Sequence, residues 1–221
     1  MPQHRMTIPD LHFIIEAAEA LRFAASPHLV FKLRITSSAP GTIHSIILKC
    51  QVHLDVSHRH YSEREQQHLR DLFGEPERWG ETLRSLLWTH TSTLVPSFDG
   101  TVIVDLPIPC TFDFNVAATK YFAGLENGEV PVSCYFSGTM FYADDNGSLR
   151  VGQIPWDKET SYRMPIRAWR SMMDLYYPNT AWLCLDRDVF ERLYGYKTLH
   201  GLPTFDQTLL RVMDASKEVA R

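Results

Sequence analysis

The sequence predicts an α+β protein that is mainly β: an antiparallel, immunoglobulin-like β-sandwich decorated by helices, with a helical C-terminal end. The clearest observation is the alternation over Ile46–Val56, where every second residue is apolar and the residues between include Lys49, Gln51 and His53. A strand with one apolar and one polar face is typical of an antiparallel sheet that packs on a core from one side. The alternation returns several times, and a helical period replaces it near the C-terminus.

Three strands are predicted in the first quarter of the chain. Leu11–Ala18 and Leu29–Thr36 alternate between apolar and other residues, and Ile43–Val56 continues the pattern. Ser, Pro and Gly in Ser37–Gly41 give this connection strong turn chemistry. We therefore expect Leu29–Thr36 and Ile43–Val56 to form a hairpin within one sheet.

A helical segment follows the third strand. Ser62 and Glu65 have the spacing of a capping box, in which each side chain accepts a hydrogen bond from the backbone N–H of the other residue. Gly74 is placed to end this helix, and a second short helix is predicted over Glu81–Leu87. We expect the pair to lie across an edge of the sandwich, where it would cover unpaired backbone groups.

Strand patterns then resume, interrupted by one helix that is predicted over Phe114–Leu125. The turn Asp144–Gly147 should join the third and fourth of these strands in a hairpin. The strands are predicted over Trp88–Val95, Thr101–Ile108, Val130–Tyr142, Leu149–Ile154 and Thr160–Met164.

The C-terminal part is predicted to be mostly helical. Pro165 suits the first turn of a helix, and a short strand is predicted over Ala181–Leu185. A helix over Val189–Leu199 should end at Gly201, and Thr204 should cap the last helix.

We expect residues 1–221 to form a single domain. The sandwich would occupy residues 1–164, with inserted helices near 62–87 and 115–125, and residues 165–221 would form a helical extension packed on it. The hydrophobic content of 44% is enough to bury a sizeable core in a chain of 221 residues.

The overall charge argues against two classes of partner. The formal net charge is −4 and no stripe of Lys and Arg is present, whereas nucleic acid and anionic membrane surfaces require clustered positive charge. No segment approaches the roughly 20 apolar residues that span a bilayer, and the N-terminal segment lacks the apolar core of a signal peptide. We expect a cytoplasmic protein without membrane insertion, whose four cysteines are reduced thiols in the core.

Enzymatic motifs are not found between the strands. The chain has no phosphate-binding loop, dinucleotide fingerprint, Gly-x-Ser-x-Gly elbow or Cys-x-x-Cys pair. We therefore expect a non-enzymatic protein without a cofactor. The alternative is a metal site, because His58 and His60 would share a face if the preceding strand continued, with His90 as a further ligand.

Aromatic and arginine side chains gather in a C-terminal stretch. Tyr, Trp and Arg dominate binding hot spots, although core packing is the alternative for each aromatic residue. Glu75–Trp79 is a second candidate surface. The candidate partner-binding residues are Trp156, Arg163, Arg167, Trp169, Tyr176, Tyr177 and Trp182.

Several longer strings carry a resemblance to a known family. They are Asp71–Gly80, Leu87–His90, Asp105–Phe114, Phe136–Thr139, Gln153–Asp157 and Gly201–Thr204. Together they resemble a bacterial family of unknown function, of about this length, whose genes often lie near those of high-affinity uptake nickel–iron hydrogenases. The resemblance implies an accessory role in hydrogenase assembly or maturation, and it carries over no catalytic residue.

Three functions are therefore open, in order of preference. The first is a non-enzymatic accessory or scaffold protein that docks a protein partner, such as a hydrogenase subunit or maturation factor. The second is a metal-binding protein or metal-dependent enzyme that uses the region of His58 and His60. The third is a self-assembling structural homo-oligomer. A contiguous exposed apolar patch would favour the first function, elemental analysis tests the second, and the mass in solution tests the third.

Overall fold

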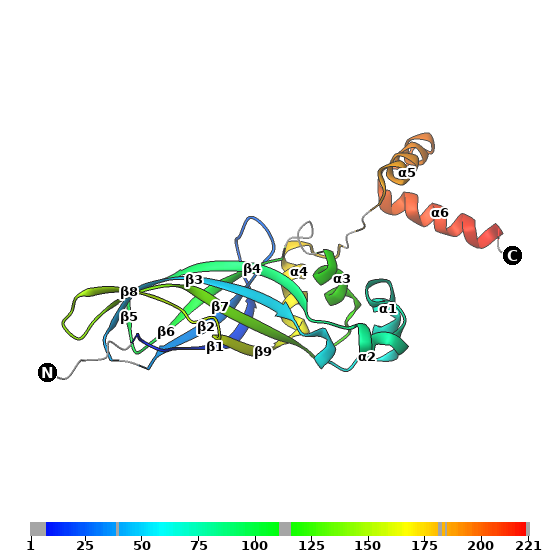
Figure 1. Cartoon of the computed structure of the whole chain (residues 1–221). Helices are drawn as coiled ribbons and strands as arrows, with labels where there is room; N and C mark the ends of the chain where they lie inside the picture. Colours follow the sequence, from blue (N-terminus) through cyan, green and yellow to red (C-terminus); the bar gives the residue numbers. More distant parts are fainter. Residues whose placement is uncertain (1–7, 39, 111–115, 181–182, 184, 220–221) are drawn as a thin grey trace. The chain divides into compact units, whose positions relative to one another are not determined.

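The chain divides into two compact units, Met1–Pro178 and Asn179–Arg221. The first unit contains the described strands, and the second contains the last two helices (Figure 1). That residues 1–221 form a single domain, with 165–221 packed on the sandwich, stays a prediction. The structure, a computed structural model, describes residues 8–38, 40–110, 116–180, 183 and 185–219.

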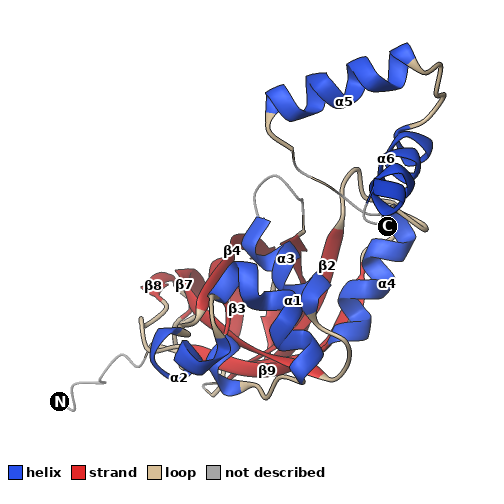
Figure 2. Ribbon diagram, turned by 90° about the vertical axis from the view of Figure 1, so that its right-hand side faces the viewer, coloured by secondary structure: helices blue, strands red, loops and turns tan. Residues whose placement is uncertain are grey.

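Two antiparallel sheets make up most of the first unit (Figure 2). The small sheet consists of β1 (Leu11–Ala20), β2 (His28–Ser37) and β6 (Thr101–Pro109), in the order β1-β2-β6. The strands of the large sheet are β3 (Thr42–Leu54), β4 (Leu86–Val95), β5 (Phe98–Asp99), β7 (Glu129–Ala143), β8 (Leu149–Gln153) and β9 (Glu159–Pro165). Their order is β4-β3-β7-β8, while β5 pairs with β3 and β9 pairs with β7.

The two sheets pack face to face through their apolar sides. In β3 the residues at alternating positions from Ile46 to Leu54 are buried, as the sequence pattern predicts. Phe13 of β1 stacks on Phe136 of β7, with ring centroids 4.2 Å apart. These contacts join one sheet to the other, so the predicted fold class, an antiparallel β-sandwich decorated by helices, is confirmed.

The predicted hairpin between the second and third strands is wrong. β2 pairs with β1 and β6 in the small sheet, whereas β3 lies in the large sheet. The segment between Ser37 and Thr42 therefore carries the chain from one sheet to the other. The physical reason is that β1 and β6 already occupy both edges of β2, which leaves no edge on which β3 could pair.

Helices lie at the strand ends of the first unit. α1 packs against α3, and Figure 1 shows α1 and α2 beyond the ends of the strands, not along an edge strand as predicted. α4 packs against β1 and β2. The bounds are η1 (Val56–His58), α1 (Glu63–Phe73), η2 (Pro76–Arg78), α2 (Trp79–Thr82), α3 (Val116–Gly124) and α4 (Ile166–Tyr176).

The helix predicted over Glu81–Leu87 is wrong for most of its length. α2 ends within this segment, and β4 begins at Leu86, which pairs with Leu54 of β3. Trp79 fixes the short helix at an earlier position, because its side chain is buried and its Nε1 donates to the carbonyl oxygen of Gly74 at 3.0 Å. A core contact thus decides where this helix forms.

The second unit consists of α5 (Arg187–Leu199) and α6 (Phe205–Val219), and both helices agree with the sequence prediction. The start of the helix predicted over Phe114–Leu125 lies outside the described residues. The strand predicted over Ala181–Leu185 also lies mostly outside them, and Leu183 and Leu185 are not in a strand. In the part of the chain that the structure describes, no helix is both long and apolar enough to cross a membrane.

A buried ion pair holds the start of α1 against the segment before β7. The side chains of Arg59 and Glu65 are 9% and 5% exposed, and Arg59 Nη2 donates to Glu65 Oε1 at 2.8 Å. Glu65 also accepts from the backbone N–H groups of Ser62 and Glu126 at 3.1 and 2.8 Å, and the predicted capping box is confirmed. Burial by itself raises the pKa of Glu65, but these hydrogen bonds outweigh it and hold the pKa below its ordinary value of 4.5.

Gly138 brings β7 close to β3 near the middle of the large sheet. It lies opposite Leu48 and has a φ of +148°. A Cβ atom at this position would clash with the backbone carbonyl oxygen of Ile47. The carbonyl oxygen of Gly138 also accepts from the N–H of Ile154 at 2.9 Å. Only glycine satisfies both the close approach and the positive φ.

We expect Glu65→Gln to lower the free energy of unfolding by about 3 kcal/mol at neutral pH, because Arg59 would stay buried without a countercharge. The pKa of Glu65 is lower in the folded state, so its stabilisation is present above the unfolded value of 4.5 and is lost as the pH falls through the folded value. Urea unfolding of both proteins as a function of pH measures this. The control Glu63→Gln, at an exposed position of the same helix, should change the unfolding free energy by less than about 0.5 kcal/mol. Equal stability of Glu65→Gln and the original chain at neutral pH would contradict the prediction.

We expect Gly138→Ala to lower the free energy of unfolding by about 3 kcal/mol, because the added Cβ must push β7 away from β3. The matched control is Gly80→Ala, since a Cβ at Gly80 meets no atom within 4 Å. Denaturant unfolding compares the two variants. A loss at Gly138 no larger than the change at Gly80 would show that the strands tolerate the wider spacing.

Candidate functional site

The outer face of the large sheet carries an apolar patch. Residues on a sheet face that meets water are ordinarily polar. Here Ile47 of β3, Leu94 of β4, and Leu149 and Val151 of β8 are 47%, 68%, 63% and 61% exposed. Half-buried Phe141 of β7 lies on the same face, since its neighbours along the strand point into the core. We call these five residues the apolar patch.

The strand register makes the apolar patch continuous. Leu94 lies directly opposite Ile47, and Val151 lies directly opposite Phe141. Phe141 is two residues along β7 from the partner of Ile47, so it is the diagonal neighbour of Ile47 on this face. Directly opposite residues on one face have Cβ atoms about 4.5–5.5 Å apart. The patch therefore crosses β4, β3, β7 and β8.

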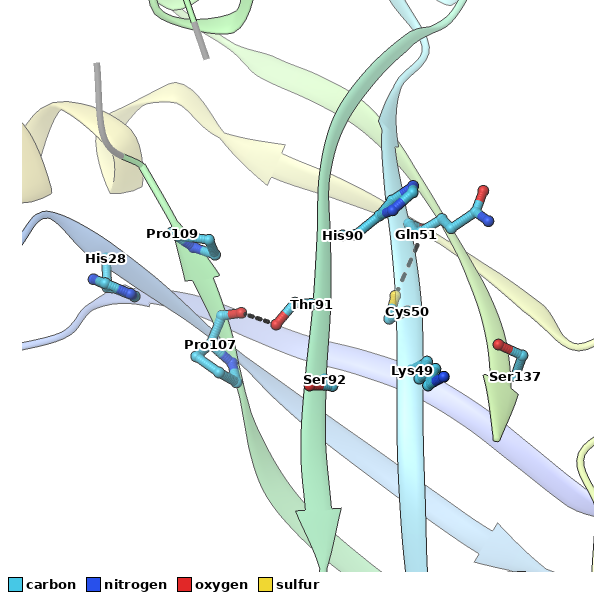
Figure 3. A pocket seen from close by; sticks show the side chains of 10 residues that line it. All are labelled: His28, Lys49, Cys50, Gln51, His90, Thr91, Ser92, Pro107, Pro109 and Ser137. Atoms are coloured by element: carbon cyan, nitrogen blue, oxygen red, sulfur yellow. Dashed lines mark hydrogen bonds between the residues drawn. The ribbon is translucent and has the colours of Figure 1, made fainter. Parts of the chain in front are cut away.

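A polar pocket of about 520 Å³ lies next to the apolar patch (Figure 3). Lys49, two residues along β3 from Ile47, lies opposite Ser92 of β4 and Ser137 of β7. Among the residues that the structure describes, the lining contains no carboxylate, so it favours a ligand or partner with acidic or carbonyl groups. The lining residues are His28, Lys49, Cys50, Gln51, His90, Thr91, Ser92, Pro107, Pro109 and Ser137.

Side chains of β4 close the sandwich edge beside this pocket. Thr91 Oγ1 donates to the carbonyl oxygen of Pro107 at 2.5 Å (Figure 3), and Thr93 Oγ1 donates to that of Asp105 at 3.3 Å. Pro107 has no N–H group to donate, and prolines within sheets are therefore found mainly in edge strands such as β6. Carbonyl oxygens at this edge of β6 are thus satisfied within the chain.

The predicted partner-binding residues lie at several different places. Trp156 lies between β8 and β9 and is 90% exposed. Arg163 is exposed on β9, opposite Pro131 of β7. Arg167 lies in the first turn of α4 and lines, with Arg170, a separate pocket of about 340 Å³.

The remaining predicted residues include one from the core. Trp169 is buried and stacks on Phe122, with ring centroids 5.3 Å apart, so it is not retained as a surface residue. Tyr176 and Tyr177 are half-buried at the end of α4. Trp182 lies outside the described residues. The second candidate surface, Glu75–Trp79, likewise contains a buried residue, since Trp79 packs in the core.

Tyr176 positions an exposed aromatic residue that no sequence pattern predicted. Phe23, between β1 and β2, has a fully exposed side chain and a φ of +63°, which is rare for a residue other than glycine. The hydroxyl of Tyr176 donates to the carbonyl oxygen of Leu21 at 2.6 Å and accepts from the N–H of Ala24 at 3.2 Å. These bonds hold the connection that presents Phe23. Hydrophobic periodicity predicts residues of helices and strands, so it gives no signal for an exposed aromatic residue in a loop.

The candidate metal ligands do not extend a strand. β3 ends at Leu54, and His58 lies in η1. His58, His60 and His90 are exposed, and His90 lies opposite Gln51 on the outer face of the large sheet. Among the residues that the structure describes, no group of three or more His, Cys, Asp or Glu side chains is placed to bind a metal ion. Metal binding near His58 and His60 stays a prediction.

Three cysteines are buried free thiols, as predicted. These are Cys50, Cys110 and Cys134, whereas Cys184 lies outside the described residues. A hydrogen bond with Cys50, together with burial, raises the pKa of the Cys134 thiol, and burial raises the pKa of Cys110 to about 12. Because the thiolate is the reactive form, the raised pKa values favour the unreactive thiol form of Cys110 and Cys134 at neutral pH.

The fold and the surface together define a β-sandwich with helices at its strand ends and an apolar patch on its larger sheet. The chain belongs to a family of unknown function (DUF6084), whose family model matches residues 8–221. The resemblance to a family of unknown function is thereby confirmed. No curated protein matches the chain.

Solved structures give only distant likenesses. β-Glucosidase 3B from Thermotoga neapolitana is 12% identical, with 70% of this chain and 17% of that protein covered and a TM-score of 0.26. The ApaA protein from Bordetella pertussis is 12% identical, with 72% and 98% covered and a TM-score of 0.24. The sporulation control protein Spo0M from Bacillus subtilis is 8% identical, with 72% and 49% covered and a TM-score of 0.26. These values support no functional inference.

We expect Tyr176→Phe to loosen the connection that carries Phe23. Loss of the hydroxyl removes a partner from Leu21 and from Ala24, at a cost of about 1 kcal/mol. Hydrogen exchange of the Ala24 amide should then become roughly fivefold faster. Tyr135→Phe, at a tyrosine on the outer face of β7, is the matched control and should leave this amide unchanged. An unchanged exchange rate of the Ala24 amide in Tyr176→Phe would show that Tyr176 does not hold this connection in place.

Proposed function

We propose that the chain is a non-enzymatic accessory protein that docks a protein partner on the outer face of its large sheet. The observation that carries this proposal is the apolar patch, whose side chains are neighbours across four strands. Scattered single apolar residues are normal on a protein surface, whereas contiguous ones mark interaction sites.

The apolar patch and its surroundings together have the composition of a protein–protein interface. Binding surfaces commonly combine an apolar centre with a polar rim. On one side of the patch lies the polar pocket, in which Lys49, Gln51 and His90 offer hydrogen-bond donors. Because none of the described residues that line the pocket is a carboxylate, we propose that the partner places acidic or carbonyl groups there.

The composition of the pocket supports binding over catalysis. Catalysis by a serine nucleophile needs the hydroxyl within hydrogen-bond reach of a base. Ser92 and Ser137 lie across the strands from Lys49, but in the described part of the chain no hydrogen bond joins either hydroxyl to Lys49 or His90. This arrangement is ordinary for the solvated face of a sheet.

The family resemblance supplies the first partner to test. The resemblance stated from the sequence implies a gene neighbourhood with uptake nickel–iron hydrogenases, so we propose a hydrogenase subunit or maturation factor as the occupant of the patch. The proposal for the patch itself does not depend on which of these proteins binds.

We expect Ile47→Lys and Val151→Lys to abolish recovery of the partner, because a charge at the centre of an apolar interface must be desolvated. The experiment is affinity purification of the tagged chain from its own host, followed by mass spectrometry. The original chain should recover one protein in stoichiometric amount, and each patch variant should recover at least about tenfold less of it.

Matched controls come from the outer face of the small sheet. Ile14 and Ile103 are 55% and 51% exposed, like the patch residues, so Ile14→Lys and Ile103→Lys introduce the same charge elsewhere. These variants should retain the partner, and thermal unfolding should confirm that every variant folds. Equal recovery by patch variants and controls would overturn the proposal. A stoichiometric metal without a partner in the same eluate would also overturn it and direct attention to His58 and His60.

A further inference from the structure

The large sheet ends at β8, and one edge of this strand has no neighbouring strand in the part of the chain that the structure describes. On its other side β8 pairs with β7. Figure 1 shows β8 at the end of the first unit away from the helices of that unit. An unpaired edge presents a row of backbone N–H and C=O groups, to which another extended chain can add as a strand.

The register shows which backbone groups of β8 face this edge. In an antiparallel pair, residues that bond to the neighbouring strand alternate with residues whose N–H and C=O groups point away from it. The N–H of Ile154 donates to the carbonyl oxygen of Gly138, and the N–H of Asp144 donates to that of Ser148, both at 2.9 Å. The even-numbered residues of β8 therefore bond to β7. The residues whose N–H and C=O groups point to the free edge are Leu149, Val151 and Gln153.

The edge of β8 lacks the features that protect sheet edges. Elsewhere in the sandwich, Thr91 and Thr93 of β4 donate to carbonyl oxygens of β6, and β1 contacts β9. Proteins also protect edge strands with prolines, β-bulges or charged side chains. β8 contains no proline and pairs with β7 without a bulge. Its one charged residue, Arg150, is held by Asp144, with Nε 2.8 Å from Oδ2.

The apolar patch extends to the same edge. Leu149 and Val151 are its outermost members, and their side chains are 63% and 61% exposed on the outer face of the large sheet. A residue directly opposite either of them on an added strand would have its Cβ atom about 4.5–5.5 Å away. Because side chains of a strand alternate between the two faces, every second residue of an added segment would lie beside the patch. Apolar residues at these positions would continue the patch.

We infer that the protein partner adds an extended segment, apolar at every second residue, as a strand to the free edge of β8. This inference rests on the proposed function, because the rest of the same partner covers the apolar patch. Strand addition is a recurring mode of peptide recognition. Backbone hydrogen bonds at the edge supply affinity in this mode, and the alternate side chains supply specificity.

Trp156 offers a further contact at one end of this edge. β3 occupies one edge of β7, and both β8 and β9 pair with the other. The connection between β8 and β9, in which Trp156 lies, therefore follows that second edge of β7. Trp156 comes three residues after Gln153, and its side chain is 90% exposed. Since tryptophan is enriched among residues that dominate binding energy, it would anchor a segment that continues past β8.

A second copy of this chain fits the edge less well than a different protein. Pairing β8 with β8 of another copy would extend the large sheet in its own plane. Ile47 and Leu94, which lie on the outer face of that sheet, would then stay exposed. Such a pair would also join only the five residues of β8 from each copy. That contact is far smaller than the roughly 1,200 Å² at which specific interfaces begin.

The first measurement is amide hydrogen exchange in the free, ¹⁵N-labelled chain. The amides of Arg150 and Gly152 should exchange slowly, because they bond to β7. Those of Leu149 and Val151 point to the free edge and should exchange at least about tenfold faster. Slow exchange at Leu149 and Val151 would show that the chain itself covers this edge, and it would overturn the inference.

The second measurement uses the complex. The labelled, tagged chain is incubated with a lysate of its own host and repurified together with the protein that it recovers. Exchange at Leu149 and Val151 should become at least about tenfold slower in this complex than in the free chain. Unchanged exchange at both amides would overturn the inference, and this readout needs no variant.

A proline at the edge tests the same hydrogen bonds. Val151→Pro removes an N–H group that points away from β7, and prolines are tolerated in edge strands in this orientation. It should lower recovery of the protein about tenfold, because an acceptor on the added segment loses its donor. Val151→Ile is the matched control, since it keeps both the N–H group and an apolar side chain, and it should retain the protein. Slow exchange at Gly152 in Val151→Pro shows that β8 stays paired with β7.

The outcomes separate this inference from the proposed function. Full recovery by Val151→Pro, together with loss of recovery by Ile47→Lys, would overturn strand addition but support docking on the apolar patch. Equal recovery by Ile47→Lys and the original chain would overturn the proposed function and this inference with it. A dimer of the free chain in sedimentation equilibrium that Val151→Pro abolishes would assign the edge to a second copy, which also overturns the inference.

Discussion

Strand β3 connects the parts of the large sheet, because it pairs with β4, β5 and β7. Its inner residues are buried against the small sheet, and this burial fixes the register of the neighbouring strands, since a slip by one residue would expose the apolar face. Gly138 permits β7 to come close to β3 at this point. The sheet, its edges and its outer surface all follow from the position of this strand.

The same register determines which residues are neighbours on the outer surface of the large sheet. Ile47 interrupts the polar face of β3, and the register brings Leu94 and Phe141 beside it. Because a sheet is rigid, it presents these apolar side chains without a large loss of conformational entropy when a partner binds. This favours a docking function. The unit that contains α5 and α6 differs from the first unit in its packing. None of the apolar side chains that the structure describes in this unit is buried.

Local features were predictable where a few neighbouring residues decide them. The capping box of Ser62 and Glu65 and the cap of α6 at Thr204 rest on contacts within one turn of helix, and both were found as expected. Long-range choices were not predictable in this way. Trp169 has the same residue type as exposed Trp156, and only packing against Phe122 places it in the core.

The sequence by itself determined the class of the fold, the strands, most helices and their caps, because alternation and capping act between residues close along the chain. The tertiary structure decided which sheet received β2 and β3, where α2 ended, and which apolar residues became neighbours on the surface. Leu94 and Val151 stand far from Ile47 in the sequence, and only the pairing of β3 with β4 and β7, and of β7 with β8, joins them in one patch. Pairing partners depend on which edges are already occupied and which faces are buried, and both are properties of the whole chain.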